Sequence, residues 1–132
     1  MIDGIHGEPE IFGSWQGFEG DDFEVVIDLQ KSRTFSKVST TFLQQYGAWI
    51  WLPSEVIYSV SDDGINFKKI FEEKNTVNQD KGGSFVKAFA GSVSGTNARY
   101  VKILAKNITT CPPWHPGAGG KAWLFVDEIE IE

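Results

Sequence analysis

Hydrophobic and polar side chains alternate with a period of two residues along much of the chain. The alternation is strongest in four runs, which are Phe23–Leu29, Glu55–Ser61, Arg99–Ala105 and Trp123–Ile131. Such alternation is typical of a β-strand with one buried and one exposed face. The pattern predicts that the last run buries Phe125, Ile129 and Ile131 together.

Three weaker runs extend the pattern to seven strands, and these are Ser36–Leu43, Phe67–Glu72 and Ser84–Ala90. Turn signals rich in glycine, aspartate and asparagine separate them, for example at Asp62-Asp63-Gly64. No window has the period of an amphipathic helix. Short strands at regular spacing predict an all-β sandwich or barrel, and the absence of repeats and linkers predicts one domain over residues 1–132.

The stretch Lys106–Ala122 (KNITTCPPWHPGAGGKA) fits neither period and separates two predicted strands. So long an irregular connection in a compact domain usually has a function or is disordered. Its three prolines stiffen the backbone, and a tryptophan is an unusual residue in a floppy tether. We therefore expect a stiff loop that presents Trp114 and His115 as part of a site.

A second loop-like insert, Gln44–Pro53, carries Trp49 and Trp51. One interpretation places both indoles in the core, and for Trp51, beside Leu52-Pro53, this is the favoured one. The other is an aromatic platform, because sugar rings pack their C–H faces on aromatic rings while their hydroxyls bond amides and imidazoles. Candidate hydroxyl partners beside Trp49 are Gln44, Gln45 and Tyr46, with His115 beside Trp114.

Composition narrows the classes of partner. The net charge is −6 and the isoelectric point is near 4.9, which argues against nucleic acid and anionic membranes because both require basic patches. No apolar run is long enough to span a membrane, so membrane insertion is not expected. The single cysteine, Cys111, excludes an intrachain disulfide and a cysteine zinc cluster.

The residues of the Lys106–Ala122 stretch give little support to other kinds of functional site. A thiol–imidazole pair of Cys111 and His115 has no evident third residue to orient it, and two prolines intervene. The segment GAGGK departs from a phosphate loop in spacing, and a strand follows it where a helix should begin. The triplet Asn107-Ile108-Thr109 matches a glycosylation acceptor, a match that is common by chance.

Several segments in chain order carry a family resemblance. An Asp3-Gly4 turn precedes Trp15, and later segments are Val26–Leu29, Ser36–Ser39, Val56–Phe67, Ala98–Lys102 and Asp127–Ile129. Their order resembles the discoidin family, also called coagulation-factor type C domains, which overlaps a family of bacterial carbohydrate-binding modules. The resemblance implies an antiparallel jelly-roll β-sandwich of the galactose-binding-domain type with eight strands.

The resemblance also implies site residues. Many relatives bind one structural Ca²⁺ near the termini, and by the match its ligands would include Asp3 and Glu128, although Ile5–Glu8 stands in place of the family's usual ligand loop. Relatives bind sugars in loops at one end of the sandwich. Here those loops would lie around Trp15–Phe18, Gln44–Trp51 and Trp114–His115.

A tighter resemblance concerns three segments, Trp15–Gly20, Gly47–Pro53 and Cys111–Ile129. They are similar to the C-terminal domain of Bacteroides-type β-N-acetylhexosaminidases. This similarity implies a C-terminal fragment of a larger exported glycosidase, located in the periplasm, at the cell surface or outside the cell.

The main hypothesis is a non-catalytic module that targets the parent enzyme to glycans containing galactose or N-acetylhexosamine. A second hypothesis is a structural module whose aromatic loops dock on the catalytic domain of the same chain without binding free sugar. A third, an independent enzyme, lacks a convincing nucleophile–base pair.

Overall fold

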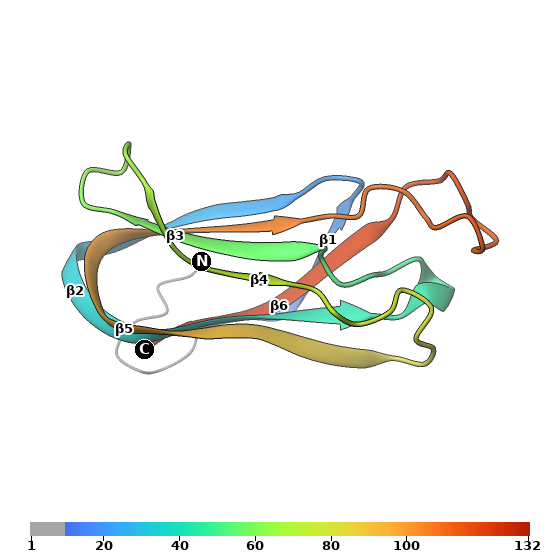
Figure 1. Cartoon of the computed structure of the whole chain (residues 1–132), viewed down its shortest axis with the longest axis horizontal. Helices are drawn as coiled ribbons and strands as arrows, with labels where there is room; N and C mark the ends of the chain where they lie inside the picture. Colours follow the sequence, from blue (N-terminus) through green and yellow to red (C-terminus); the bar gives the residue numbers. More distant parts are fainter. Residues whose placement is uncertain (1–9) are drawn as a thin grey trace.

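The computed structural model describes residues 10–132, which fold into six strands and one short 3-10 helix (Figure 1). The elements are β1 (Glu10–Glu19), β2 (Phe23–Gln44), the 3-10 helix η1 (Tyr46–Ala48), β3 (Glu55–Ser61), β4 (Lys68–Lys74), β5 (Phe85–Lys106) and β6 (Trp123–Ile131). The strand order is β1-β6-β2-β5-β3-β4, and every pair is antiparallel. No helix in the described part of the chain is long and apolar enough to cross a membrane.

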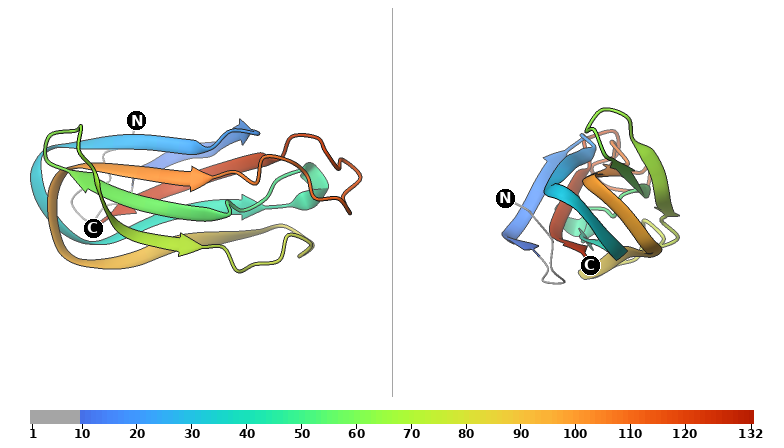
Figure 2. Two further views of the ribbon diagram at one scale, coloured as in Figure 1. Left: turned by 45° about the horizontal axis from the view of Figure 1, so that its top comes forward. Right: turned by 90° about the vertical axis from the view of Figure 1, so that its left-hand side faces the viewer.

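The two long strands give the molecule its two layers. The first part of β2 pairs with the last part of β5, from Phe23 opposite Ala105, and β3 and β4 extend this layer. The last part of β2 pairs with the first part of β5, up to Gln44 opposite Phe85, and β6 and β1 extend the second layer. Both long strands curve round at the same end of the molecule, so the sheet folds over on itself (Figures 1 and 2). The prediction of an all-β antiparallel sandwich is confirmed.

The strand count differs from the prediction because predicted runs merge. Phe23–Leu29 and Ser36–Leu43 are two halves of β2, and Ser84–Ala90 and Arg99–Ala105 are two halves of β5. The polar stretches between them look like turns in the sequence, yet they stay extended and bend through irregularities in the ladder, one of which lies between Asp28 and Arg33. The described strands thus supply the eight strand segments that the family resemblance implies.

The prediction of a loop at Trp15–Phe18 is wrong, because these residues lie in β1. Gln16 stands opposite Val126 and Phe18 opposite Leu124 on β6. Strand β1 has two glycines and no clean alternation, and its ladder is interrupted between Ile11 and Gln16. The backbone pairing with β6 therefore makes it a strand without a strong sequence signal.

The main core lies between the layers and follows the predicted alternation for most strands. Buried side chains include Phe23, Ile27, Leu29, Val56, Tyr58, Val101, Ile103 and Ala105. The Tyr58 hydroxyl of β3 donates to the Phe89 carbonyl at 2.6 Å and lies 2.8 Å from Thr40 Oγ1, both on the other layer. These bonds satisfy the phenol inside the core, and burial raises its pKa.

Strand β6 departs from the predicted face. Leu124 and Val126 are buried along with Ile129 and Ile131, whereas Phe125 is half-buried on the outer side, in ring contact with Trp123 at 5.9 Å. Thr40 pairs with Ile129 while Phe42 pairs with Val126, so one residue of β2 faces two of β6. This β-bulge reverses the alternation after Val126.

The end where β2 and β5 curve also carries the turn between β3 and β4, and we call it the bend end (Figure 1). In that turn the Asp63 carboxylate accepts hydrogen bonds from the backbone N–H groups of Ile65 and Asn66 and from the Ser61 hydroxyl. Nearby, Arg99 forms a two-pronged ion pair with Asp28 at 2.8 and 3.0 Å. Local polar contacts therefore shape this end.

Candidate functional site

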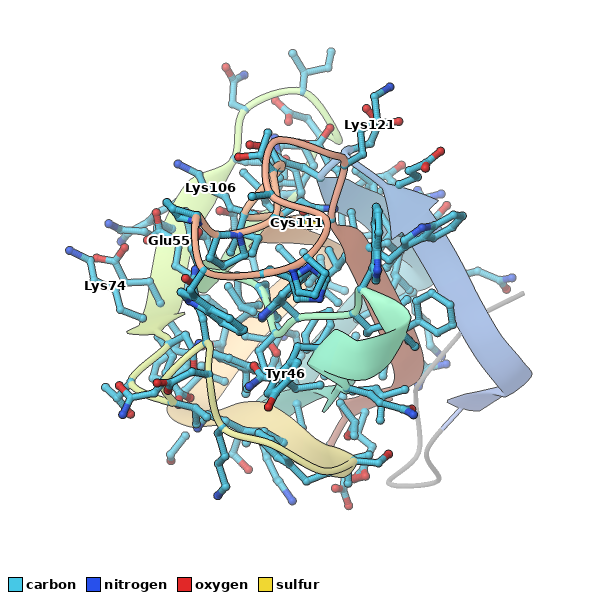
Figure 3. All side chains as sticks on the ribbon, turned by 90° about the vertical axis from the view of Figure 1, so that its right-hand side faces the viewer. Tyr46, Glu55, Lys74, Lys106, Cys111 and Lys121 are labelled. Carbon is cyan, nitrogen blue, oxygen red and sulfur yellow. The ribbon has the colours of Figure 1, made fainter. Side chains whose placement is uncertain are left out.

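Three connections meet at the opposite end, which we call the loop end; they are residues 45–54, 75–84 and 107–122 (Figures 1 and 3). The first is joined to the start of β6, since Trp123 N donates to Trp49 O at 2.8 Å and Trp51 N to Trp123 O at 3.1 Å. It is joined to the second by the Trp51 indole nitrogen, which donates to Gln79 O at 3.0 Å. The third is joined to the first by a bond between His115 Nε2 and Tyr46 O at 2.7 Å, so the three connections form one hydrogen-bonded unit.

The long connection is ordered by its own backbone. A short ladder runs at its base, where Cys111 N donates to Gly120 O at 2.8 Å and Ala122 N to Thr109 O at 3.0 Å. Its tip is a succession of tight turns, including His115 N to Pro112 O at 3.0 Å and Ala118 N to His115 O at 2.9 Å. The expectation of an irregular but ordered loop is confirmed.

Asn107 anchors the base of this loop. Its buried side-chain nitrogen donates to the carbonyls of Phe18, Asp21 and Ala122 at 3.0, 3.1 and 3.3 Å, and its oxygen accepts from Thr109 N at 2.8 Å. An amide nitrogen with three carbonyl partners inside the fold is not open to a glycosyl group. Asn107 therefore has a structural role, although the sequence around it matches a glycosylation acceptor.

His115 is the centre of an aromatic cluster formed with Tyr46, Trp49, Trp51 and Trp114. Its ring is 4% exposed and lies between 4.9 and 6.2 Å, centroid to centroid, from the four other rings, all in edge-to-face geometry. Nδ1 accepts from Gly117 N at 2.9 Å, so the ring proton resides on Nε2, which donates to Tyr46 O at 2.7 Å. Both nitrogens are committed to backbone groups, so His115 holds the loops together and offers no open hydrogen-bonding atom.

Those two backbone bonds also leave no nitrogen for a thiol–imidazole pair. Cys111 is buried in a small second core with Trp51 and Ala122, and its sulfur faces Lys121 O at 3.8 Å. Burial raises the pKa of the Cys111 thiol, which favours the unreactive protonated form. The structure assigns this cysteine to packing.

Two members of the aromatic cluster reach the surface, because Trp49 is 40% and Trp114 is 48% exposed. A Cβ atom on Gly117 would lie 2.5, 2.6 and 2.8 Å from three atoms of the Trp49 benzo ring, so this glycine sits beneath the ring face. The other side chain, Trp114, packs edge to face on Tyr46 at 5.2 Å. Both indoles are thus fixed from below and open above.

The remaining predicted residues divide between the interior and the surface. Gln44 is fully buried, and its amide nitrogen donates to Asn78 O at 3.0 Å, so it braces the 75–84 connection. Gln45 is exposed, and its side chain makes no hydrogen bond within residues 10–132, while Tyr46 is half-buried. Trp51 is 1% exposed, which confirms its interpretation as a core residue.

The sequence did not indicate the parts played by Gly117 and Gln79. Gly117 is one of several glycines in the second half of the long connection, and only its position near two tryptophans in the sequence was a weak signal that an indole packs on it. Gln79 acts through its backbone carbonyl, which any residue would supply. No residue-type pattern would have identified it.

The predicted calcium site falls largely outside what is described. Asp3 lies outside the described residues, and only the backbone of Glu128 is described, in β6 opposite Ile11. Among the side chains that the structure does describe, no three acidic, histidine or cysteine groups gather as cation ligands. Calcium binding therefore stays a prediction.

Comparison with protein families gives a match to the F5/8 type C domain over residues 1–126. The chain belongs to this family. Domains of this kind are generally non-catalytic. Comparison with curated proteins gave no match.

Among solved structures, this F5/8 type C domain resembles the family 32 carbohydrate-binding module (CBM32) of AlyQ in complex with 4,5-unsaturated mannuronic acid, with a TM-score of 0.56 and 15% identity, over 98% of this chain and 83% of that one. A putative chitobiase fragment from Bacteroides thetaiotaomicron has a TM-score of 0.50 and 15% identity, over 83% and 62% of the two chains. The module CpGH89CBM32-5 from Clostridium perfringens, in complex with GalNAc-β-1,3-galactose, is 27% identical with a TM-score of 0.45, over 78% of this chain and 63% of its own. The domain therefore has the fold of such modules, and spans less than two thirds of two of these structures.

Proposed function

We propose that this F5/8 type C domain is a non-catalytic carbohydrate-binding accessory module of an exported β-N-acetylhexosaminidase. The observation that carries the proposal is the pair of exposed indoles, Trp49 and Trp114, on a buried and hydrogen-bonded frame. An aromatic face held open to solvent suits the C–H face of a sugar ring. The similar AlyQ module is a structure in complex with a sugar, which supports this class of ligand.

The frame limits the entropy that binding would cost. Trp49 rests on Gly117 and contacts His115 at 5.6 Å, while Trp114 contacts both Tyr46 and His115. Side chains that are already immobilised lose little freedom when a ligand arrives, so more of the contact energy appears as affinity. Among the described residues close to Trp49 in the sequence, Gln45 has the exposed amide that is best placed to hydrogen-bond sugar hydroxyls.

The sequence resemblance supports the proposed parent enzyme and the proposed ligand. The segments similar to β-N-acetylhexosaminidases include Gly47–Pro53 and Cys111–Ile129, which build most of the aromatic cluster. We expect glycans containing galactose or N-acetylhexosamine, bound at millimolar to micromolar affinity for each site. Such weak sites would retain an exported enzyme on multivalent substrate by raising its effective concentration.

A second function uses the same surface. Exposed indoles on a rigid loop also suit docking against the catalytic domain of the parent chain. Quenching of tryptophan fluorescence by acrylamide separates the two, because docking would shield Trp49 and Trp114 in the full-length parent and a free binding face would not.

The test of glycan binding compares Trp49→Ala and Trp114→Ala with Ile65→Ala. Ile65 is 81% exposed in the turn at the bend end, so its variant removes a surface hydrophobic group far from the loops. Each tryptophan variant should lose at least about tenfold in retention on a glycan array, about 1.4 kcal/mol. If the tryptophan variants are retained as well as Ile65→Ala and their thermal stability is unchanged, the sugar site lies elsewhere. If their thermal stability collapses, the indoles have a structural role and the assignment of the site is wrong.

A further inference from the structure

A groove lies on the far side of the loop segment that supports Trp49. A hollow of about 620 Å³ is lined by residues that include Ile108, Thr110, Pro112, Pro113 and Ala118 of the long connection and by Gln79 of the 75–84 connection. Its volume is in the range of small-ligand sites. Figure 3 looks onto this end, with Tyr46 on η1 and the loop that contains Cys111 above it.

The segment 117–120 is a wall shared by the aromatic surface and this hollow. Gly117 and Gly120 face the indole of Trp49, since a Cβ atom on either would lie within 3.1 Å of its benzo ring. Ala118 and Gly119, between them, line the hollow. Only this segment of backbone therefore separates the indole from the hollow, and a chain-like ligand that extends past the edge of the indole and over the segment would reach the hollow.

A second hollow adjoins the first. A depression of about 380 Å³ shares Gln79 and Ile108 with the first and is otherwise lined by Ser54 and residues 75–78. The two hollows are thus neighbours at Gln79 and Ile108, and we call them together the trough. A trough of this kind has room for more than the single ring that the indole holds.

The lining of the trough is uncharged and mixed in polarity. None of the described residues that line either hollow carries a charge, although the chain as a whole has a net charge of −6. Prolines, Ile108 and Ala118 supply apolar surface. The exposed side chains of Thr76, Asn78 and Gln79 make no hydrogen bond within the described part of the chain, so they are open to hydroxyl groups.

The outer wall of the trough is held in place from inside the molecule. Gln44 Nε2 donates to Asn78 O at 3.0 Å and to Lys81 O at 3.4 Å, and Trp51 Nε1 donates to Gln79 O at 3.0 Å. Two buried side chains thus fix the connection that carries the free polar groups. The wall of the trough is therefore preformed, as the walls of ligand sites usually are.

From these observations we infer that the trough is an extension of the sugar site and takes the further units of an uncharged oligosaccharide whose first unit stacks on Trp49. The inference rests on the proposed function. It makes the domain a binder of glycan chains, in which affinity rises with chain length. Charged saccharides gain nothing from the trough, because desolvating a charge against a lining without counter-charges is unfavourable.

The experiment titrates the domain calorimetrically with N-acetylglucosamine and chitotetraose, and with galactose and β-1,4-galactotetraose, at physiological ionic strength. A tetrasaccharide offers four similar units, so chance alone raises its affinity by about fourfold. The trough predicts a gain of at least about fiftyfold in one of the series. A gain of about fourfold or less in both series would overturn the inference and leave the proposed function standing, whereas no binding of any of the saccharides would overturn both.

Variants test whether the gain in affinity for the tetrasaccharide arises in the trough. Ala118→Arg fills the first hollow with a long side chain, and Gln79→Ala removes a free amide while keeping the carbonyl that Trp51 bonds. Ala88→Arg is the matched control, on an exposed position of β5. Ala118→Arg should reduce the tetrasaccharide to the affinity expected by chance, with the monosaccharide unchanged, and Gln79→Ala should lower only the tetrasaccharide, by about threefold. A tetrasaccharide gain that survives Ala118→Arg would overturn the inference.

Discussion

At the bend end the polar contacts are exposed, both those between near neighbours at Asp63 and the one between Arg99 and Asp28, whereas at the loop end buried rings join separate connections. Asp63 accepts hydrogen bonds from residues no more than three positions away. His115, in contrast, bonds Tyr46, 69 positions away, and contacts rings from two connections. The β3–β4 turn at the bend end and the connections at the loop end both lie outside the strands, yet among the described residues only the loop end has a core of its own.

The difference teaches how a loop surface becomes rigid enough to recognise a ligand. Exposed ion pairs and turn hydrogen bonds compete with water, so each contributes little and they act separately. A buried cluster excludes water and couples its members, because moving one ring exposes or unpairs the others. The loop end therefore behaves as a part of the core that presents two indoles, whereas the exposed polar contacts of the bend end act independently of one another.

The largest expected effect comes from removing the centre of the aromatic cluster. His115→Ala leaves Gly117 N without a partner, removes one of the two hydrogen bonds to Tyr46 O and opens a cavity among four rings, so we expect a loss of about 3–5 kcal/mol in the free energy of unfolding. Urea titration followed by near-ultraviolet circular dichroism measures it. His115→Leu, which restores volume but not the hydrogen bonds, should recover only part of the loss. Wild-type stability in both variants would contradict the view that the loop end has a coupled core.

A smaller effect is expected where the loop backbone supports Trp49. Gly117→Ala places a Cβ atom 2.5 Å from the indole, which must shift, at a cost of about 1–3 kcal/mol. Gly47→Ala is the matched control, because nothing lies within 4 Å of the added atom. A change in the tryptophan emission maximum should accompany the loss in Gly117→Ala alone. Equal behaviour of the two variants would show that the indole is loosely held.

The smallest effect is expected at the bend end. Hydrogen bonds from the backbone of Asn66 and Ile65, and then from Ser61, hold the pKa of Asp63 below its ordinary value of 3.8. A lowered carboxyl pKa stabilises the fold above the ordinary pKa, and the contribution is lost as the pH falls through the folded-state pKa. Thermal melts of Asp63→Ala should thus show a modest loss at neutral pH that shrinks below about pH 4, while Asp62→Ala, at the exposed neighbouring position, should show none. A loss as large as that of His115→Ala would erase the contrast between the ends.

The sequence predicted the layers well because alternation is a local signal. The runs around Ile27, Tyr58 and Ile103 each place every second side chain in the core, as expected. It failed where the backbone departs from a simple period, as in the bulge that turns Phe125 outward and in β1, whose partner lies more than a hundred residues away. Extended polar bends such as the one in β2 also look like turns when read locally.

For the site, the sequence indicated the right loops but not the part that each side chain plays. Trp49 and Trp114 are at the surface as the platform hypothesis requires, and their contact with sugar stays a prediction. Gln44 and His115 looked like ligand-binding groups, since polar side chains in loops usually are exposed. Their burial depends on Asn78 and Gly117, carbonyl and amide partners that carry no residue-type signature.

The continuity of β2 and β5 through both layers has a kinetic consequence. The first residue of β2 pairs with Ala105 and its last with Phe85, so neither layer forms before chain segments at least 40 positions apart have met. Such non-local pairing makes folding slow, on the order of milliseconds to seconds. Register shifts in the bend, between Asp28 and Arg33 and between Phe35 and Lys37, separate the pairing of the two layers, so a slip by one residue would turn the core face of a single layer outward. Since both layers nevertheless need the same two strands, we expect them to appear in a single kinetic phase, with no half-sandwich along the way.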